Sequence, residues 1–213
     1  MRVGLYQTGE IEFMKLFEDI ALIQPKLMGW CSPVKAATLA GAVLALRPEV
    51  ILEIGVFGGS SFIPMAMAAR EVGRGIVYGI DPWDAKASAD GQINPADQAY
   101  WSKQETHDVV YNDFMGRIQE LNLGPFINIQ RVKSDDADVP NGVGFWHLDG
   151  NHSDQAIKDV DKFAPKCLRG ALCFADDCQW TGGGVLRAVA KLKSMGWQEL
   201  YTLDTGAMLQ KRT

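Results

Sequence analysis

The stretch VILEIGVFGGS, residues 50–60, decides how this chain of 213 residues folds. Its first five residues are apolar apart from Glu53, which predicts a short strand buried on both faces of a sheet. Three glycines follow, and glycine lets a backbone turn sharply and approach a ligand closely. A helix beginning near Ser60 would point its free N–H groups and its positive dipole end at this turn. The glycines alone fit either a ligand site or a tight turn without one.

Strands and helices alternate on the carboxyl-terminal side of this stretch. Apolar runs predict further strands over residues 76–80, 126–132, 143–148 and 171–175. Helices are expected over about 60–72, 153–163 and 183–194. Two last runs, 197–203 and 207–211, are joined by Asp204-Thr205-Gly206, which is typical of a β-hairpin. This order predicts an α/β fold: a doubly wound, Rossmann-like, mostly parallel sheet of seven strands, with helices on both faces and a C-terminal antiparallel hairpin.

Two helices are predicted ahead of the first strand, within residues 1–47. Apolar residues recur at helical spacing over 9–23, and Pro25 ends that helix. Ser32-Pro33 is typical of a helix start, with serine as the N-cap and proline in the first turn, and this helix runs to about Leu46. The length suits a single core, so we treat residues 1–213 as one domain.

Residues 82–113, between the second and third predicted strands, do not fit the alternation. They are polar and contain two prolines and large aromatic residues that include Trp83, Tyr100 and Trp101. Long insertions of this kind are often lids over a binding site. A surface helix held by aromatic anchors is an equally good interpretation.

The composition is that of an ordinary globular protein, with 47% hydrophobic and 22% charged residues. The net charge of −5 argues against nucleic acid or an anionic membrane as the main partner, because both attract basic surfaces. Four cysteines without CxxC spacing indicate reduced thiols. No apolar run reaches the ~20 residues that span a bilayer, and the first residues lack the apolar stretch of a signal peptide. We therefore expect a cytoplasmic protein whose partner is a small molecule.

An acid ends the second predicted strand. Asp81 lies 26 residues after Gly55, a position from which a carboxylate can accept hydrogen bonds from two ribose hydroxyls. NAD-binding proteins use the same device, so Asp81 indicates a ribose and leaves the cofactor open. The glycine spacing is GxxGG, whereas the dinucleotide fingerprint is GxGxxG. A turn aspartate that precedes Pro82 is the alternative.

Three further acids follow predicted strands: Asp149 after the fourth strand, and Asp176 and Asp177 after the fifth. If these strands are neighbours, the three carboxylates meet at one edge of the sheet and shift each other's pKa. A divalent cation with oxygen ligands would relieve their repulsion, and Mg²⁺, Mn²⁺ or Ca²⁺ are the natural candidates. Alternatively, Asp176 or Asp177 caps the next helix or binds a lysine or arginine.

His152 lies three residues after Asp149. A neutral imidazole at this place could take a proton from an acceptor hydroxyl near pH 7. It could also be a helix-start residue with an ordinary hydrogen bond. The other two histidines are assigned no chemistry: His147 is interpreted as a packed core residue of the fourth strand, and His107 shows no partner within the insertion.

Four segments in register, ILEIGVFGGSS, VYGIDPW, WHLDGNHS and APKCLRGALCFADD, resemble the class I S-adenosylmethionine-dependent methyltransferases. The chain looks most like their small-molecule O-methyltransferase branch, which includes catechol and sugar O-methyltransferases. The similarity covers about residues 28–180. One departure is Asp177, where catechol enzymes usually carry asparagine and some sugar enzymes carry an acid, and this departure leaves the metal and the acceptor open.

The resemblance implies a role for each cofactor motif. Its first motif would bind the methionine part of the cofactor, S-adenosyl-L-methionine, through Glu53, Gly55, Gly58, Gly59 and Ser60. Asp81 would hold the ribose, Trp83 would lie near the adenine, and the adenine amino group would meet Ser134 and Asp135. The segment Met28-Gly29-Trp30 resembles one that lies over the cofactor in this family, or it is a hydrophobic hinge.

At the acidic edge, the resemblance implies that His152 is the catalytic base. It also implies that Asp149 contacts the cofactor, ligates the metal and takes part in catalysis. Asp149, Asp176 and Asp177 would hold Mg²⁺, or else Mn²⁺ or Ca²⁺. The expected function is methyl transfer to a hydroxyl oxygen of a small molecule, with the metal lowering the pKa of the acceptor oxygens. Aromatic residues of the insertion would close over the site.

Two other functions share the predicted fold. A nicotinamide-dependent oxidoreductase would use the same ribose acid, but the glycine spacing differs and no Tyr-x-x-x-Lys pair stands out. A cofactor-binding protein without methyl transfer would keep the pocket, although the acids and histidine that chemistry would need are intact. The N-terminal helix could in addition join two copies as a homodimer.

Overall fold

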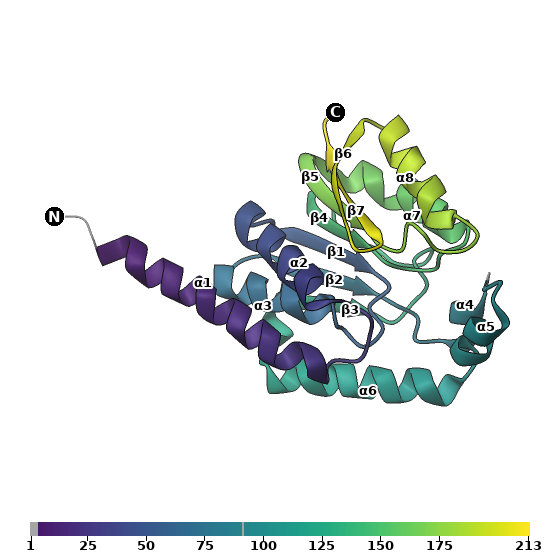
Figure 1. Ribbon diagram of the computed structural model, residues 1–213, viewed down its shortest axis with the longest axis horizontal. Helices are drawn as coiled ribbons and strands as arrows, with labels where there is room; N and C mark the ends of the chain where they lie inside the picture. Colours follow the sequence, from purple (N-terminus) through teal and green to yellow (C-terminus); the bar gives the residue numbers. More distant parts are fainter. Residues whose placement is uncertain (1–3, 91) are drawn as a thin grey trace.

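The computed structural model describes the backbone of residues 4–90 and 92–213, and the side chains from Phe13 onward except that of residue 91. Within this part of the chain, one sheet contains seven strands in the order β3-β2-β1-β4-β5-β7-β6 (Figure 1). The strands are β1 (Val50–Ile54), β2 (Ile76–Ile80), β3 (Ile127–Gln130), β4 (Val143–Leu148), β5 (Cys167–Ala175), β6 (Trp197–Leu203) and β7 (Gly206–Lys211). Strands β1 to β5 pair in parallel, and β7 runs antiparallel to β5 and β6. The predicted fold class is therefore confirmed.

Each predicted helix is present and begins within five residues of its expected start. The helices are α1 (Gly4–Ile23), α2 (Pro33–Leu46), α3 (Phe62–Val72), α4 (Ala85–Ala89), α5 (Pro95–Trp101), α6 (Gln104–Glu120), α7 (Gln155–Phe163) and α8 (Gly184–Ser194). Three short 3-10 turns, η1 (Gln24–Lys26), η2 (Gly124–Phe126) and η3 (Ala164–Lys166), complete the chain. The apolar spacing predicted over 9–23 can be followed from Phe13 on, where Leu16, Ile20 and Ile23 are buried. None of the described helices is both long enough and apolar enough to cross a membrane.

Local chemistry sets several of these ends. Ser32 caps α2 as predicted, since its Oγ accepts a hydrogen bond of 3.1 Å from the backbone N–H of Lys35. Gly73 closes α3 in the left-handed conformation, with φ of 68°. The third strand is shorter than predicted, because Pro125 places the residues before Ile127 in the turn η2. The fifth strand is longer than predicted and begins at Cys167.

Alternate residues of the central strands face opposite sides of the sheet. Ile51 and Phe145 join the core that contains apolar residues of α1, α2, α3 and α6, whereas Leu52 and Trp146 join the core of α7 and α8. Figure 1 shows these two groups of helices on opposite faces. This doubly wound arrangement leaves the carboxyl-terminal edge of the parallel strands free to form a site.

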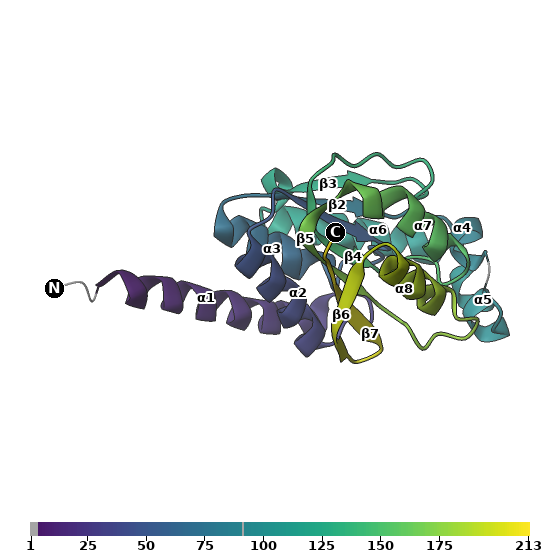
Figure 2. The same ribbon diagram turned by 90° about the horizontal axis from the view of Figure 1, so that it is seen from above.

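Residues 82–113 form more than the single surface helix that was one interpretation of the insertion. They contain α4, α5 and the first part of α6. The two short helices lie at the end of the molecule away from α1 in both views (Figures 1 and 2). Helix α6 packs on the body through Val110, Phe114 and Ile118, all buried.

Candidate active site

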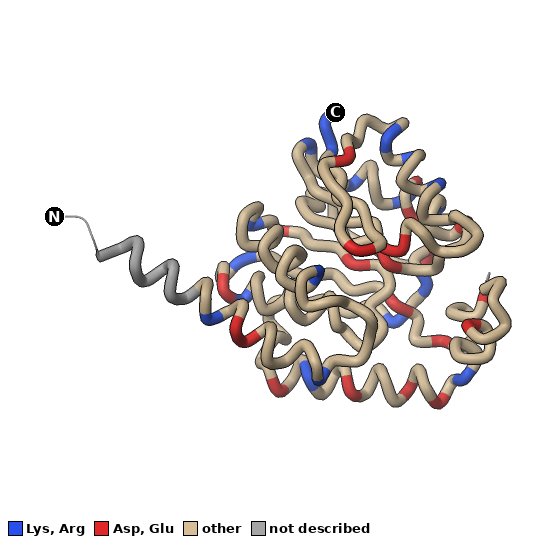
Figure 3. The backbone as a smooth tube through the Cα atoms, viewed as in Figure 1, with Lys and Arg blue, Asp and Glu red and all other residues tan. Residues whose placement is uncertain are grey.

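A cavity of about 410 Å³ opens at the carboxyl-terminal edge of the sheet. Its walls come from the ends of β1, β2, β4 and β5 and from the first turns of α2 and α7. Figure 3 shows acidic segments gathered at this edge of the central strands. The volume falls within the roughly 300–1,000 Å³ of small-molecule sites, and the position is the one where open α/β sheets bind ligands.

The turn after β1 places only part of the predicted glycine motif against the cavity. Gly55 and Ser60 line it. Gly55 has φ of 86°, and a Cβ there would lie 2.0 Å from the backbone oxygen of Asp149. Gly58 and Gly59 do not line it, and their assignment to cofactor binding stays a prediction. They are packing glycines: a Cβ on Gly58 would lie 2.4 Å from Met28, and one on Gly59 2.5 Å from the ring of Phe114.

Glu53 is fully buried behind the cavity and does not line it, so its predicted contact with the cofactor is not part of the observed cavity wall. One carboxylate oxygen, Oε1, accepts a hydrogen bond from Ser61 Oγ at 2.5 Å and contacts His147 Nδ1 at 2.7 Å. The strand alternation explains this placement, because Glu53 points toward its neighbour in register on β4, which is His147. Glu53 therefore stabilises the residues behind the cavity wall through its contacts with Ser61 and His147.

Asp81 lies where the sequence predicts, at the end of β2 and in the wall of the cavity. Its Oδ2 accepts hydrogen bonds from the backbone N–H groups of Val56 (3.0 Å) and Phe57 (2.9 Å), and its Oδ1 accepts one from Trp83 (2.7 Å). Burial raises the pKa of Asp81, and these three N–H groups oppose the rise. The carboxylate thus fixes the glycine turn and still faces the cavity.

Trp83 does not lie beside a cofactor, contrary to its predicted role near the adenine and over the site. Its side chain has no exposed surface and packs on Tyr111 and Phe114, with ring centroids 4.9 and 5.8 Å away. Its Nε1 donates to the carbonyl of Phe57 at 2.8 Å. Trp83 is a core residue because a large indole gains most from burial when its N–H finds an acceptor there.

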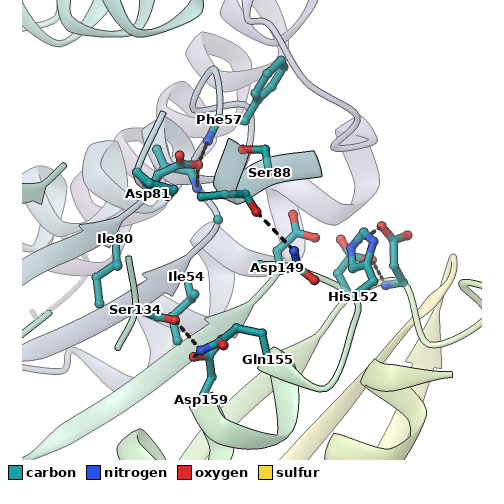
Figure 4. Close-up of a pocket in the computed structure, with 18 of the residues that line it drawn as sticks. Ile54, Phe57, Ile80, Asp81, Ser88, Ser134, Asp149, His152, Gln155 and Asp159 are labelled. Carbon is teal, nitrogen blue, oxygen red and sulfur yellow. Dashed lines mark hydrogen bonds and ion pairs between the residues drawn. The ribbon is translucent and has the colours of Figure 1, made fainter. Parts of the chain in front are cut away.

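Ser134 and Asp135 both line the cavity, as predicted, and two further residues join them. Gln155 Nε2 donates to Ser134 Oγ (3.1 Å), Asp135 Oδ1 (2.8 Å) and Asp159 Oδ1 (3.2 Å). Figure 4 shows Ser134, Gln155 and Asp159 together on one side of the cavity. The sequence contains a signal for Asp159 that went unused: it is an acid on the apolar face of α7, between Ala156 and Phe163.

Asp159 is 1% exposed, and its Oδ2 has no hydrogen-bond partner among the described residues. Burial raises its pKa to about 6, although the hydrogen bonds with Ser134 and Gln155 oppose this. An unpaired buried acceptor is costly unless a donor reaches it. This corner of the cavity therefore favours a ligand with an N–H or O–H group.

The three acids predicted to share a metal do meet at the cavity, but they divide into two groups. Among the described residues, the ligand atoms of Asp149 come within 4.8 Å of those of His147 and Asp176, and separately of those of His152 and Asp177. The set Asp149, Asp176 and Asp177 is not such a group. Asp176 contacts Lys35 and Asp177 contacts His152, while the Thr205 hydroxyl lies near both carboxylates.

Lys35 is the partner of Asp176 and was missed by the sequence reasoning. Its Nζ forms a buried ion pair and hydrogen bond with Asp176 Oδ2, and both side chains are less than 10% exposed. The alternative interpretation of this acid, that it binds a lysine, is confirmed. A signal was present, because Lys35 is the one charged residue in the apolar segment PVKAATLAGAVLAL.

His147 is not the plain core residue that the sequence suggests. It is fully buried between two acids, with Nδ1 at 2.7 Å from Glu53 and Nε2 at 3.7 Å from Asp176. Burial alone lowers its pKa, but its interactions with Asp176 and Glu53 outweigh this and raise it to about 10. His147 is therefore a buried cation. His107 likewise has a partner, since its Nε2 lies 2.8 Å from the carbonyl of Trp101.

His152 faces the cavity beside Asp149 and Asp177 (Figure 4). Its Nε2 lies 3.3 Å from Asp177 Oδ2, and its ring packs on Trp180 with 4.6 Å between centroids. Burial lowers the pKa of His152, and the neighbouring acids oppose this. Burial, followed by the charge of Asp176, raises the pKa of Asp149 well above its usual range. The lowered pKa keeps His152 neutral and able to accept a proton near pH 7, whereas the raised pKa favours the protonated form of Asp149.

Aromatic residues form one rim of the cavity. Gly29 and Trp30 line it, in accord with the predicted placement of that segment. Trp30 stacks on Phe57 with 5.3 Å between centroids and is 69% exposed. Trp101 packs edge-on against both rings. Asn151, which follows β4, donates to the carbonyl of Asp90 at 2.6 Å and so ties the insertion to the site.

Comparisons with known proteins agree with this fold. The structure of the O-methyltransferase NovP superposes with a TM-score of 0.67 and 13% identity, over 87% of this chain and 84% of that one. The SAH-bound methyltransferase PaMTH1 of Podospora anserina gives 0.63 and 11%, over 95% and 88%. TomG of Streptomyces achromogenes, an O-methyltransferase of tomaymycin synthesis solved with SAM, gives 0.62 and 15%, over 93% and 89%. No curated protein matches the sequence.

A family model described as a methyltransferase domain matches residues 52–178. This range runs from β1 to the loop after β5 and contains each of the cavity-lining acids described above. It covers more than half of the chain. The chain therefore belongs to the methyltransferase domain family.

Proposed function

We propose that this protein transfers the methyl group of S-adenosyl-L-methionine to a hydroxyl oxygen of a small-molecule acceptor. One arrangement carries the proposal: a single cavity joins Asp81 and Asp159, which can hold an adenosine, to Asp149 and His152, which can handle a proton (Figure 4). Family membership supports the methyl transfer. Structural neighbours described as O-methyltransferases support an oxygen acceptor.

The cavity residues fit the cofactor. Asp159 offers a buried oxygen without a partner, and the exocyclic amino group of an adenine is a donor of the right kind. Ile54 and Ile80 provide an apolar wall for the ring (Figure 4). The carboxylate of Asp81 can accept from ribose hydroxyls in the manner of open α/β sheets. Ser60, at the glycine turn ahead of α3, faces the same cavity.

When bound, S-adenosylmethionine supplies a methyl group on a sulfonium, which needs no further activation. The tasks left to the protein are to align the acceptor and to remove its proton. Asp149 lines the cavity beside His152 and faces the acceptor. His152, kept neutral by burial, takes the proton as the new carbon–oxygen bond forms. The aromatic rim around Trp30 and Trp101 shields this corner from water.

The three acids predicted as ligands of a divalent cation fit such an ion poorly as a set. Asp176 is already paired with the ammonium group of Lys35, and Asp177 faces His152. Their oxygens do not converge with those of Asp149 on one point. No step of the proposed reaction is therefore assigned to a metal.

Methyl-labelled S-adenosylmethionine tests the proposal directly. The protein is incubated with it and a panel of catechols, simple phenols and methyl glycosides, and labelled products are identified by mass spectrometry. We expect label on a hydroxyl oxygen of at least one class. The His152→Ala variant should lose roughly 10²–10⁴-fold in rate while its cofactor affinity stays unchanged, and Asp161→Asn on the outer face of α7 serves as the control. Label transfer only to nitrogen or sulfur would refute the acceptor, and an unchanged rate in His152→Ala would refute the base.

A further inference from the structure

Lys35 carries a charge in a buried position, which is unusual for a lysine. It sits in the first turn of α2, in a helix that is otherwise apolar, and its side chain is 7% exposed. A lysine is rarely buried unless it is paired. Its ammonium group lines the cavity and reaches Asp176, 141 residues further along the chain. The helix cap at Ser32 fixes the position of its backbone.

Asp176 has no oxygen left over for a metal ion. Its Oδ2 binds Lys35 and lies 3.7 Å from His147 Nε2. Its Oδ1 accepts a hydrogen bond from the backbone N–H of Asp177 (2.9 Å) and lies 3.3 Å from the hydroxyl of Thr205, which is nearer to Asp177. A divalent cation needs direct contact with oxygen at about 2.0–2.6 Å. An ion at Asp176 would therefore stand beside an ammonium group inside a buried site, where like charges repel strongly.

The inner acids have partners within the protein. Lys35 is a cation whose ammonium group binds Asp176, and the imidazole of His147 lies between Glu53 and Asp176. On the outer side, Asp177 has His152 at 3.3 Å and the Thr205 hydroxyl at 3.0 Å. Asp149 is the remaining acid, and among the described residues only burial and neighbouring charges act on its carboxylate.

We infer that Lys35 is the resident cation of this acidic cluster: its ammonium group takes the place of a divalent ion, so that the site binds no metal and Asp149 stays open to the acceptor. The part concerning the acceptor rests on the proposed function, whereas the part concerning the metal does not. Lys35 acts as a positioning residue, because its ammonium group binds the carboxylate of Asp176 and fixes it in place.

Manganese titration separates this inference from methyl transfer, since it needs neither cofactor nor acceptor. Mn²⁺ binding is followed by the loss of the free-ion signal in electron paramagnetic resonance at pH 7.5. The wild-type protein should show no saturable site. Lys35→Met removes the charge and keeps the length of the side chain, and we expect it to gain Mn²⁺ affinity by at least about tenfold. Adding Asp149→Asn to Lys35→Met should abolish the gain.

Lys191→Met is the matched control. It removes the same charge from an ion pair with Asp161, in which the two side chains are 34% and 57% exposed. Its Mn²⁺ affinity should equal that of the wild type. A saturable wild-type site that Asp149→Asn removes would overturn the inference, and so would a Lys35→Met variant that binds Mn²⁺ no better than Lys191→Met.

Circular dichroism shows whether Lys35→Met folds. If it does not, Lys35→Arg, which keeps the cation, gives the second comparison: it should bind no more Mn²⁺ than the wild type, and a saturable site in either protein would overturn the inference. The titration of S-adenosylmethionine is run separately on the same samples. Its failure would remove the proposed function and leave the metal result standing.

Discussion

The backbone oxygen of Asp149 occupies the space that a side chain on Gly55 would need. A Cβ on Gly55 would lie 2.0 Å from that oxygen, and the glycine has φ of 86°. Strands β1 and β4 are neighbours in the sheet, so their two ends meet at this contact. The glycine that marks the predicted motif therefore brings the acid of β4 close to the turn of β1.

Gly55→Ala should be strongly destabilising. The methyl group would strike a backbone atom that cannot rotate away, and alanine is strained at a positive φ. We expect a loss of about 2–5 kcal/mol in the free energy of unfolding, measured with urea. Gly73→Ala is the control, because its φ is 68° but no atom lies within 4 Å of the added carbon. It should lose only about 1–2 kcal/mol, and equal losses in the two variants would show that the contact with Asp149 is unimportant.

Glu53→Gln should weaken the fold rather than cofactor binding. The change leaves the buried imidazolium of His147 with one carboxylate fewer, and breaking a buried pair costs about 3–5 kcal/mol. The pKa of His147 is raised in the folded state to about 10, so the pair stabilises fully below about pH 6.5, the unfolded value. That stability is lost as the pH rises through 10. Urea unfolding at pH 7 and pH 10.5 should therefore show a large cost that shrinks at high pH, and a cost that does not vary with pH would contradict the charged pair.

Asp159→Asn should stabilise the protein at alkaline pH. The pKa of Asp159 is raised on folding from 3.8 to about 6, so its contribution to stability is fully present below pH 3.8 and is lost as the pH rises through 6. Above pH 7 the buried carboxylate is a penalty that the amide removes, by roughly 1–3 kcal/mol. Unfolding curves at pH 5 and pH 8 measure this difference. Asp161→Asn on the exposed side of α7 is the control and should show no such trend; a gain of Asp159→Asn at pH 5 as large as at pH 8 would exclude the titration as its cause.

The insertion should become more ordered when the cavity is filled. We predict that S-adenosylhomocysteine slows amide hydrogen exchange in residues 85–90 and 92–101, because this segment reaches the site through Asn151 and the aromatic rim. Exchange in α1, at the other end of the molecule from α4 and α5 (Figures 1 and 2), serves as the internal reference. Equal exchange with and without ligand in both segments would mean that the insertion is a fixed surface feature and no lid.

The strand ends of this fold are predictable from the sequence because each buried strand is apolar and stops at a polar residue or glycine. That rule places Asp81, Asp149, Asp176 and Asp177 at the cavity. It does not say which way a side chain points beyond the strand. Gly58 and Gly59 follow β1, yet Gly58 packs against Met28 and Gly59 against Phe114. Both partners lie far away in the sequence, so no local pattern reveals these contacts.

The second limit on predicting the site from the sequence is that charged partners can lie far apart in the chain. Lys35 and Asp176 are 141 residues apart, and only the crossing of α2 over the end of β5 brings them together. The pattern does make Lys35 conspicuous, as a single charge in an apolar helix, but it does not name the acid. The divalent metal is predicted from the acids at one edge of the sheet alone. Lys35 and His147 also reach this edge and contact Asp176, so the edge is less negative than the acids by themselves would make it.

Isothermal titration of S-adenosylmethionine tests the central claim most directly. We predict saturable binding to the wild-type protein and none of NAD. Asp81→Asn should weaken binding by roughly 10–100-fold, since a charged hydrogen-bond acceptor is lost, whereas Asp84→Asn, at the exposed cap of α4, should not. Binding of NAD in place of S-adenosylmethionine, or no binding of either, would contradict the account and leave only the fold.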